Sequence, residues 1–74
     1  MRTHQKRLLK LGERIEYERR RKNITLDELA TQMGISKGNL SDIENGKRDP
    51  RFTTLLAIAE GLRIKVSYLL RYLG

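Results

Sequence analysis

The chain has 74 residues, enough for one domain with a small core over residues 1–74, and it contains no cysteine. Disulfides and thiolate metal sites are therefore excluded, and we expect a cytoplasmic protein with no metal and no cofactor. No apolar run approaches the roughly 20 residues that cross a bilayer, and no apolar signal core follows the charged N-terminus. We therefore expect no membrane partner.

The formal net charge of +7 is concentrated at the start of the chain, where residues 1–22 hold nine basic and three acidic side chains. Such a balance favours a polyanionic partner through counterion release, but solvated helix faces also produce it. The basic run at residues 19–22 could clamp phosphates, but we interpret most of it as a solvated face. No paired carboxylates, activated nucleophile or phosphate-binding glycine loop is evident, so we do not expect an enzyme.

The spacing of apolar residues predicts five helices and no strand. The first helix is expected over about residues 5–22, with Leu8, Leu11 and Ile15 on its apolar face. The second is expected over about residues 26–32. Thr25 is its N-cap, Glu28 completes a capping box, and Gly34 ends the helix in a left-handed conformation.

Three shorter helices are predicted after Gly34. Ser36 caps the third, over about residues 37–44, and the residue before Pro50 favours a loop. The fourth spans about residues 53–61, and its expected buried residues are Leu55, Leu56, Ala59 and Leu62. Ser67 is the expected cap of a last helix over residues 68–72.

The second and third predicted helices, joined at Gly34, form a helix-turn-helix pattern over residues 25–45. The outer face of the third helix is polar, as in a helix that reads the major groove. Its candidate base-contacting residues are Lys37, Gly38, Asn39, Ser41 and Asp42. The alternative is that these are ordinary solvent-facing residues.

Lysine donates to guanine and asparagine pairs with adenine, but Lys37 and Asn39 lie about 200° apart around the helix and cannot share one face. We expect Lys37 to contact the base. Asp42 is expected either to accept from cytosine or to pair with Lys37 or another neighbour. Gly38 either lets the helix approach a base edge closely or has no role.

Several motifs agree in order with one known family: Thr25-x-x-Glu28-Leu29-Ala30, Gly34-Ile35-Ser36, Leu40-Ser41-x-Ile43-Glu44-Asn45-Gly46-Lys47-Arg48-x-Pro50 and Thr54-Leu55-Leu56-x-Ile58-Ala59. Over about residues 10–70 the chain resembles the Cro/repressor-type (Xre-like) helix-turn-helix family. The resemblance implies a compact, all-α, five-helix repressor-like DNA-binding domain of a transcriptional regulator, usually dimeric.

The resemblance also implies roles for particular residues. Arg19 is expected to pair with Glu44 and so brace the recognition helix, and Asn45 and the following loop are expected to approach the phosphate backbone. The expected phosphate contacts are Thr25, Asn45, Lys47, Arg48 and Arg51. Two positions depart from the family pattern: Leu26 replaces a glutamine that contacts phosphate, and Arg63 replaces a glycine. Arg63 must therefore either adopt a positive φ or distort the link.

The C-terminal segment, residues 67–73, is the expected dimerisation element because its apolar residues cluster at the end of a small domain. The residues concerned are Tyr68, Leu69, Tyr72 and Leu73, of which Leu69 is also the best candidate for the core.

We interpret the chain as a sequence-specific, homodimeric transcriptional regulator of double-stranded DNA with a palindromic operator. The expected type is a repressor or autoregulator of phage, plasmid or restriction-modification controller origin, with no ligand-sensing domain and no small-molecule effector. Two alternatives stay open: the antitoxin subunit of a toxin–antitoxin operon, and a protein-interaction module that has lost DNA binding. An interaction module would not need Lys37 and Asn39, and its complex would depend only weakly on salt.

Overall fold

The computed structural model describes residues 3–71 and 73. Its helices are α1 (Thr3–Arg21), α2 (Leu26–Met33), α3 (Lys37–Glu44), α4 (Phe52–Leu62) and α5 (Val66–Leu70). Within this part of the chain there is no strand, which confirms the all-α prediction. None of the helices described is long and apolar enough to cross a membrane.

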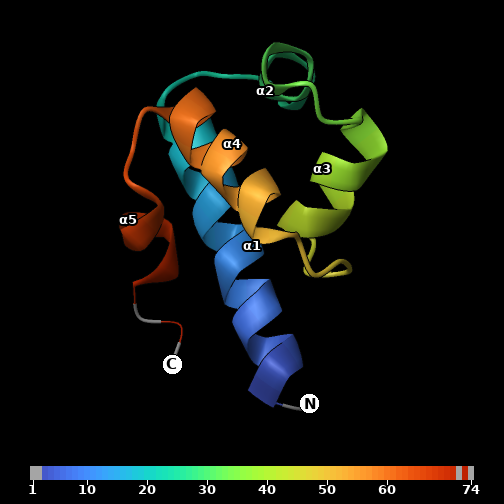
Figure 1. Ribbon diagram of the computed structural model, residues 1–74, viewed down its shortest axis with the longest axis vertical. Helices are drawn as coiled ribbons and strands as arrows, with labels where there is room; N and C mark the ends of the chain where they lie inside the picture. The colour runs from blue at the N-terminus through green and yellow to red at the C-terminus, as the bar shows by residue number, and fades with distance from the viewer. Residues whose placement is uncertain (1–2, 72, 74) are drawn as a thin grey trace.

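The long helix α1 is the scaffold of the domain (Figure 1). Helices α3, α4 and α5 all contact it, with α5 and α3 on opposite sides of the view and α4 in front. Helix α2 lies across the top and packs against α3 and α4. The N-terminal turns of α1 extend below the other helices.

All five helices contribute to one hydrophobic core. Its buried residues are Leu11, Ile15, Leu29, Ala30, Leu40, Ile43, Leu55, Ile58, Ala59, Leu62 and Leu69. In α4 the prediction for Leu56 was wrong, because its side chain is 42% exposed while that of Ile58 is fully buried. Residues 55, 58, 59 and 62 form the helical stripe that faces the core, and Leu56 lies about 100° away from Leu55 around the helix.

The predicted start of α2 is confirmed in detail. The Glu28 amide donates to Thr25 Oγ1 at 3.0 Å, and the Thr25 amide donates to Glu28 Oε1 at 2.8 Å. These two bonds form a capping box, and the hydrogen bond from the Thr25 backbone lowers the pKa of Glu28. At the other end, Gly34 has φ +68° and ψ +29°, the predicted left-handed conformation.

The link between α4 and α5 resolves one expectation and corrects another. Arg63 adopts the left-handed conformation, with φ +58°, and its amide donates to the Glu60 carbonyl at 3.0 Å, so the link keeps a regular geometry. Helix α5 then begins at Val66, with Lys65 at the N-cap position and no side-chain cap. The prediction that Ser67 caps this helix was therefore wrong, because the tight turn at Arg63 brings the chain back into helix before residue 67.

Candidate nucleic-acid interface

Helices α2 and α3 meet through the short turn at Gly34. The Ile35 amide donates to the Ala30 carbonyl at 2.9 Å, which closes α2, and Ser36 Oγ accepts from the Asn39 amide at 3.1 Å, which begins α3. The inner side of α3 is fixed by Leu40, Ile43 and Glu44, all buried. The opposite side of α3 therefore faces outward.

The five predicted base-contacting residues differ in exposure. Lys37 and Gly38 are exposed at the start of α3, while Asn39, Ser41 and Asp42 are half-buried. A Cβ atom at Gly38 would meet no atom within 4 Å, so the helix surface is open there.

The charged groups on this surface are paired loosely with neighbours. Lys37 Nζ lies 3.7 Å from Asp27 Oδ1, and Arg48 Nη2 lies 3.4 Å from Asp42 Oδ2. Asp42 thus pairs with a neighbour other than Lys37. Both pairs are more than 40% exposed, and such surface pairs contribute only about 0–1 kcal/mol. A phosphate or base could displace either carboxylate at little cost.

A groove of about 390 Å³ separates α3 from the start of α4. Its lining residues are Asn39, Arg48, Asp49, Pro50, Arg51 and Thr54. Asn39 lines this groove, and its side-chain oxygen is buried and has no hydrogen-bond partner within the described residues. The groove therefore combines a residue whose amide oxygen lacks a partner with two arginines.

The remaining predicted phosphate contacts surround α3. Thr25, Asn45, Lys47 and Arg51 are all exposed. Thr25 Oγ1 accepts the capping bond from Glu28, which leaves its hydroxyl hydrogen to donate. The loop after α3 is anchored because the Lys47 amide donates to the Asp42 carbonyl at 2.8 Å. Leu26, which replaces the family's glutamine, packs against the core.

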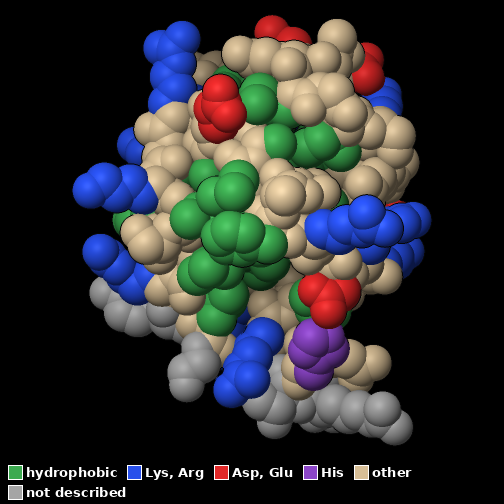
Figure 2. Space-filling model, viewed as in Figure 1, with side chains coloured by type: hydrophobic (Ala, Val, Ile, Leu, Met, Phe, Trp, Pro, Cys, Tyr) green, Lys and Arg blue, Asp and Glu red, His purple; other side chains and the backbone are tan. Residues whose placement is uncertain are grey.

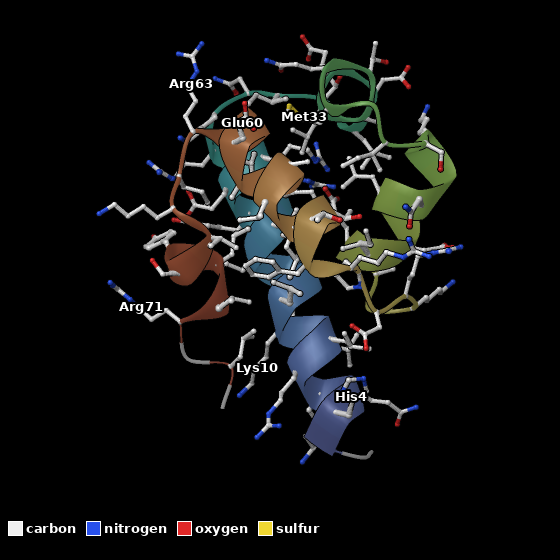
Figure 3. The ribbon with its side chains drawn as sticks, in the orientation of Figure 1. His4, Lys10, Met33, Glu60, Arg63 and Arg71 are labelled. Carbon is white, nitrogen blue, oxygen red and sulfur yellow. The ribbon has the colours of Figure 1, made fainter. Side chains whose placement is uncertain are left out.

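One acidic group and one histidine complete the surroundings of this surface. His4 Nε2 lies 3.2 Å from Asp49 Oδ2, so the N-terminal turn of α1, where Figure 3 labels His4, contacts the loop between α3 and α4. Among the described residues, no group of three His, Cys, Asp or Glu side chains could hold a metal ion.

Behind α3, the structure brings Arg19 and Glu44 together. Arg19 Nε and Nη2 donate to the two carboxylate oxygens of Glu44 at 2.8 and 3.0 Å, and Nη1 donates to the Ile24 carbonyl at 2.9 Å. Each residue is only 7% exposed. The hydrogen bond to Glu44 raises the pKa of Arg19, so the guanidinium stays charged. The pair fixes the end of α3 to α1.

Gly12 is a structural residue that our sequence reasoning missed. It lies where α1 crosses the end of α3, and a Cβ atom there would overlap the carbonyl oxygens of Ile43 and Glu44. Only glycine permits this close backbone approach. The sequence signal was a glycine inside a predicted helix, one of the known signs of tight packing.

The predicted dimerisation residues are not equally available. Leu69 is fully buried, which confirms its prediction as a core residue and makes its assignment to a dimer interface wrong. Tyr68 is half-buried, with the Arg14 guanidinium 4.2 Å from its ring centre, and Leu73 packs partly against the core. Tyr72 lies outside the described residues.

Comparison with known proteins gives consistent matches. A helix-turn-helix family model, HTH_3, matches residues 15–69. The transcriptional repressor RghR of Bacillus subtilis is 41% identical over 72% of this chain and 40% of its own length. The crystal structure of the restriction-modification controller C.AhdI from Aeromonas hydrophila has a TM-score of 0.82 and 27% identity, covering 84% of this chain and 94% of the controller.

A second controller, C.Esp1396I, was solved as a tetramer in complex with its natural 35-base-pair operator. It has a TM-score of 0.80 and 25% identity, covering 90% of this chain and 88% of that protein. The first curated relatives are longer, and this chain spans 40 to 49% of their length. The family match covers most of the chain, and the solved structures share its fold: the chain belongs to the helix-turn-helix family of Cro/Xre-type transcriptional regulators.

Proposed function

We propose that this protein is a homodimeric transcriptional regulator that binds a palindromic double-stranded operator by placing α3 in the major groove. The observation on which the proposal depends is the outward polar face of α3, bordered by the groove with Arg48 and Arg51. The operator complex of C.Esp1396I supports it by similarity. Repression or autoregulation in the cytoplasm, as in controllers and phage repressors, is the proposed mode of action.

Within this proposal the surface residues divide into two roles. Lys37 is the first residue of α3, and the helix surface beside it is open at Gly38. Lys37 therefore contacts a base edge. Ser41 and Asp42 lie beside it, about one helical turn further along α3. Asn39 lines the groove between α3 and α4, where it either contacts the DNA phosphate backbone or supports a neighbouring side chain. Thr25, Asn45, Lys47, Arg48 and Arg51 contact phosphates and fix the register.

A two-fold axis would place the two copies of α3 about 34–36 Å apart, one helical turn of DNA. Each copy would then contact one half-site, which explains why we propose a palindromic operator. The concentration of the protein and its dimerisation would then determine the fraction of operator sites that are occupied.

The test begins with selection of bound sequences from a random duplex library, followed by titration of the best site at several salt concentrations. If the dimer neutralises roughly 6 to 10 phosphates, the logarithm of the affinity should fall by about 0.9 per phosphate with each tenfold rise in salt. No enriched sequence, together with binding that is flat in salt, would contradict the proposal and favour a protein-interaction module.

Two lysine variants separate base contact from phosphate contact. Lys37→Ala should cost ~1–3 kcal/mol on the best site and relax the preference at one base pair per half-site. Lys47→Ala should weaken all sequences about equally and reduce the salt slope. Lys65→Ala is the matched control, since Lys65 is exposed between α4 and α5. An even loss over all sequences for Lys37→Ala would instead assign it to phosphate.

A further inference from the structure

A second groove lies between α1 and α5, and Figure 1 places α5 and α3 on opposite sides of α1. The groove encloses about 650 Å³ and is larger than the groove of about 390 Å³ beside α3. Its two walls are lined by Lys10 and Arg14 from α1 and by Tyr68 and Arg71 from α5 and the residue after it. Figure 3 labels Lys10 and Arg71, one on each wall. The proposed DNA contacts do not use this groove, which leaves it for a different partner.

The α1 wall belongs to a basic stripe that contains one aromatic residue. Its members recur at intervals of three or four residues and therefore share one face of the helix: Lys10, Arg14, Tyr17 and Arg21. Arg14 is half-buried and the other three are exposed. In Figure 2, Lys and Arg side chains project from the left-hand edge of the molecule, the side on which Figure 1 shows α5. This side of the domain therefore presents cationic groups to its surroundings.

Three arginines gather around the ring of Tyr68. The guanidinium carbons of Arg14 and Arg71 lie 4.2 and 5.5 Å from the ring centre, and Arg21 lines a neighbouring hollow together with this tyrosine. Glu18, which is fully buried, accepts from Arg21 Nη2 at 3.0 Å. Its second oxygen lies 3.9 Å from Arg14 Nε, which has no hydrogen-bond partner within the described residues. Glu18 therefore compensates the three guanidiniums incompletely, and an anionic group from a partner would be attracted to them.

The groove continues past Tyr68 and so becomes elongated. A second hollow of about 300 Å³ is lined by Arg21 and Lys65, and it shares Tyr68 and Arg71 with the larger groove. An extended polypeptide fits a long concave surface, whereas a DNA duplex is convex and would touch only its rim. Glu13, which also lines the groove, would repel a uniform row of phosphates. Shape and charge together therefore favour a protein segment over a nucleic acid.

Part of the groove is apolar. Leu69 and Leu73 line it, and the side chain of Tyr17 beside them is 60% exposed. An apolar side chain of a partner that packs against Tyr17 and Leu73 would remove apolar surface from water on both molecules. Cationic walls with an apolar contact between them match an acidic segment that carries an apolar side chain.

We propose that the groove between α1 and α5 binds an acidic linear segment of a partner protein. The carboxylates of the segment contact Lys10, Arg14 and Arg71, and one of its apolar side chains packs against Tyr17 and Leu73. Because α5 and α3 lie on opposite sides of α1, the segment binds protein that is already on DNA and recruits its partner to the operator. This recruitment rests on the proposed function, whereas occupation of the groove does not.

The first experiment selects ligands from a phage-displayed library of random linear peptides. The bait is the protein bound to its best duplex, so that the α3 surface is covered and peptides that mimic DNA are not enriched. Phage that bind the duplex alone are removed beforehand. Enriched peptides should combine several aspartate or glutamate residues with a leucine or a phenylalanine. No enrichment, or enrichment of basic or uncharged peptides, would overturn the proposal.

The second experiment locates the bound peptide by fluorescence polarisation of a fluorescein-labelled copy of the most enriched sequence. Lys10→Glu and Arg71→Glu should each weaken its binding at least about tenfold, because a charge-assisted contact is replaced by repulsion. Arg20→Glu is the matched control, since Arg20 is also exposed on α1 but pairs with Glu16, and it should weaken binding less than about twofold. All three positions are exposed, so circular dichroism should show folded variants. Equal affinities of the groove variants and the control would overturn the proposal.

Competition with DNA separates this inference from the proposed function. The labelled peptide should bind the free and the duplex-bound protein about equally, because the two sites share no residue. Displacement of the peptide by the duplex would overturn the inference. Sedimentation in which Lys10→Glu or Arg71→Glu dissociates a dimer of the parent would also overturn it, because a second copy would then occupy the groove. A parent that binds no duplex would refute the proposed function; the selection is then run on the free protein, and the same groove and control variants decide the inference.

Discussion

The Arg19–Glu44 pair gives a sharp test of how α3 is held. Arg19 is only 7% exposed, and Glu44→Ala would leave its guanidinium with the hydrogen bond to the Ile24 carbonyl but without its carboxylate partner. Two charge-assisted hydrogen bonds, at 2.8 and 3.0 Å, would be lost together. Removing one partner of such a buried pair costs about 3–5 kcal/mol, because the remaining charge is buried without compensation.

That loss is large for this domain. At about 0.05–0.15 kcal/mol per residue, 74 residues have a free energy of unfolding of about 4–11 kcal/mol. A change of 1 kcal/mol shifts Tm by about 4–8 °C in a domain of this size. Glu44→Ala should therefore lower Tm by at least about 12 °C.

The assay is urea and thermal unfolding followed by circular dichroism. Glu16→Ala is the matched control, because Glu16 pairs with Arg20 at a similar distance, 3.0 Å, but on the surface, and should cost less than about 1 kcal/mol. The double variant Arg19→Met/Glu44→Leu should recover most of the loss, since an apolar pair needs no compensation. A Glu44→Ala protein that unfolds within 1 kcal/mol of the parent, like the control, would refute the reasoning.

Four further variants test local geometry and capping by the same unfolding assays. Gly12→Ala should lower the free energy of unfolding by ~1–3 kcal/mol, because its methyl group would overlap the backbone of α3. Gly38→Ala has open space around it and should raise the free energy of unfolding by up to ~1 kcal/mol through helix propensity. Equal effects of the two variants would contradict this reasoning. Arg63→Gly should stabilise the fold by ~1 kcal/mol, because glycine adopts the left-handed conformation at φ +58° without strain. A lower Tm of this variant would show that contacts of the arginine side chain stabilise the fold by more than the strain destabilises it. Since the pKa of Glu28 is lowered in the folded state, its stabilisation is present above its unfolded pKa near 4.5 and is lost as the pH falls below that value. Glu28→Gln keeps a capping side chain but should reduce this pH dependence in melts between pH 7 and pH 3, and an unchanged profile would exclude Glu28 as its source.

The local features of the fold were predictable because local chemistry determines them. Thr25 with Glu28, Ser36 and Gly34 are cap and turn residues whose hydrogen bonds involve only near neighbours. Their spacing therefore predicted the starts of α2 and α3 and the end of α2 correctly.

The errors arose where tertiary packing decides. The pattern around Leu56 permits two apolar stripes on α4, and the packing of α2, α5 and α1 against this helix selects the one that contains Ile58. The start of α5 depends on the turn at Arg63, and the role of Gly12 depends on how closely α1 and α3 cross. None of these can be decided from neighbouring residues alone.

The candidate site shows the same division. The polar face of α3 follows from helical periodicity, but the groove that joins Asn39 to Arg48, Arg51 and Thr54 requires the chain to return after Pro50. Thr54 was missed as a residue of the site because it lies in the first turn of α4, a helix whose apolar pattern predicts only a role in the core.

The outer face of α3 is free to vary because other parts of the chain hold the helix. With eight residues, α3 is too short to be stable alone, so its conformation depends on the Ser36 cap and its orientation on Glu44 and on the contact at Gly12. None of these groups lies on the outward side that includes Lys37 and Gly38. Under the proposed function, specificity can therefore change by substitution on that side without loss of the fold, whereas a change at Arg19, Glu44 or Gly12 would move the whole proposed DNA-contacting surface and weaken binding to every DNA sequence alike.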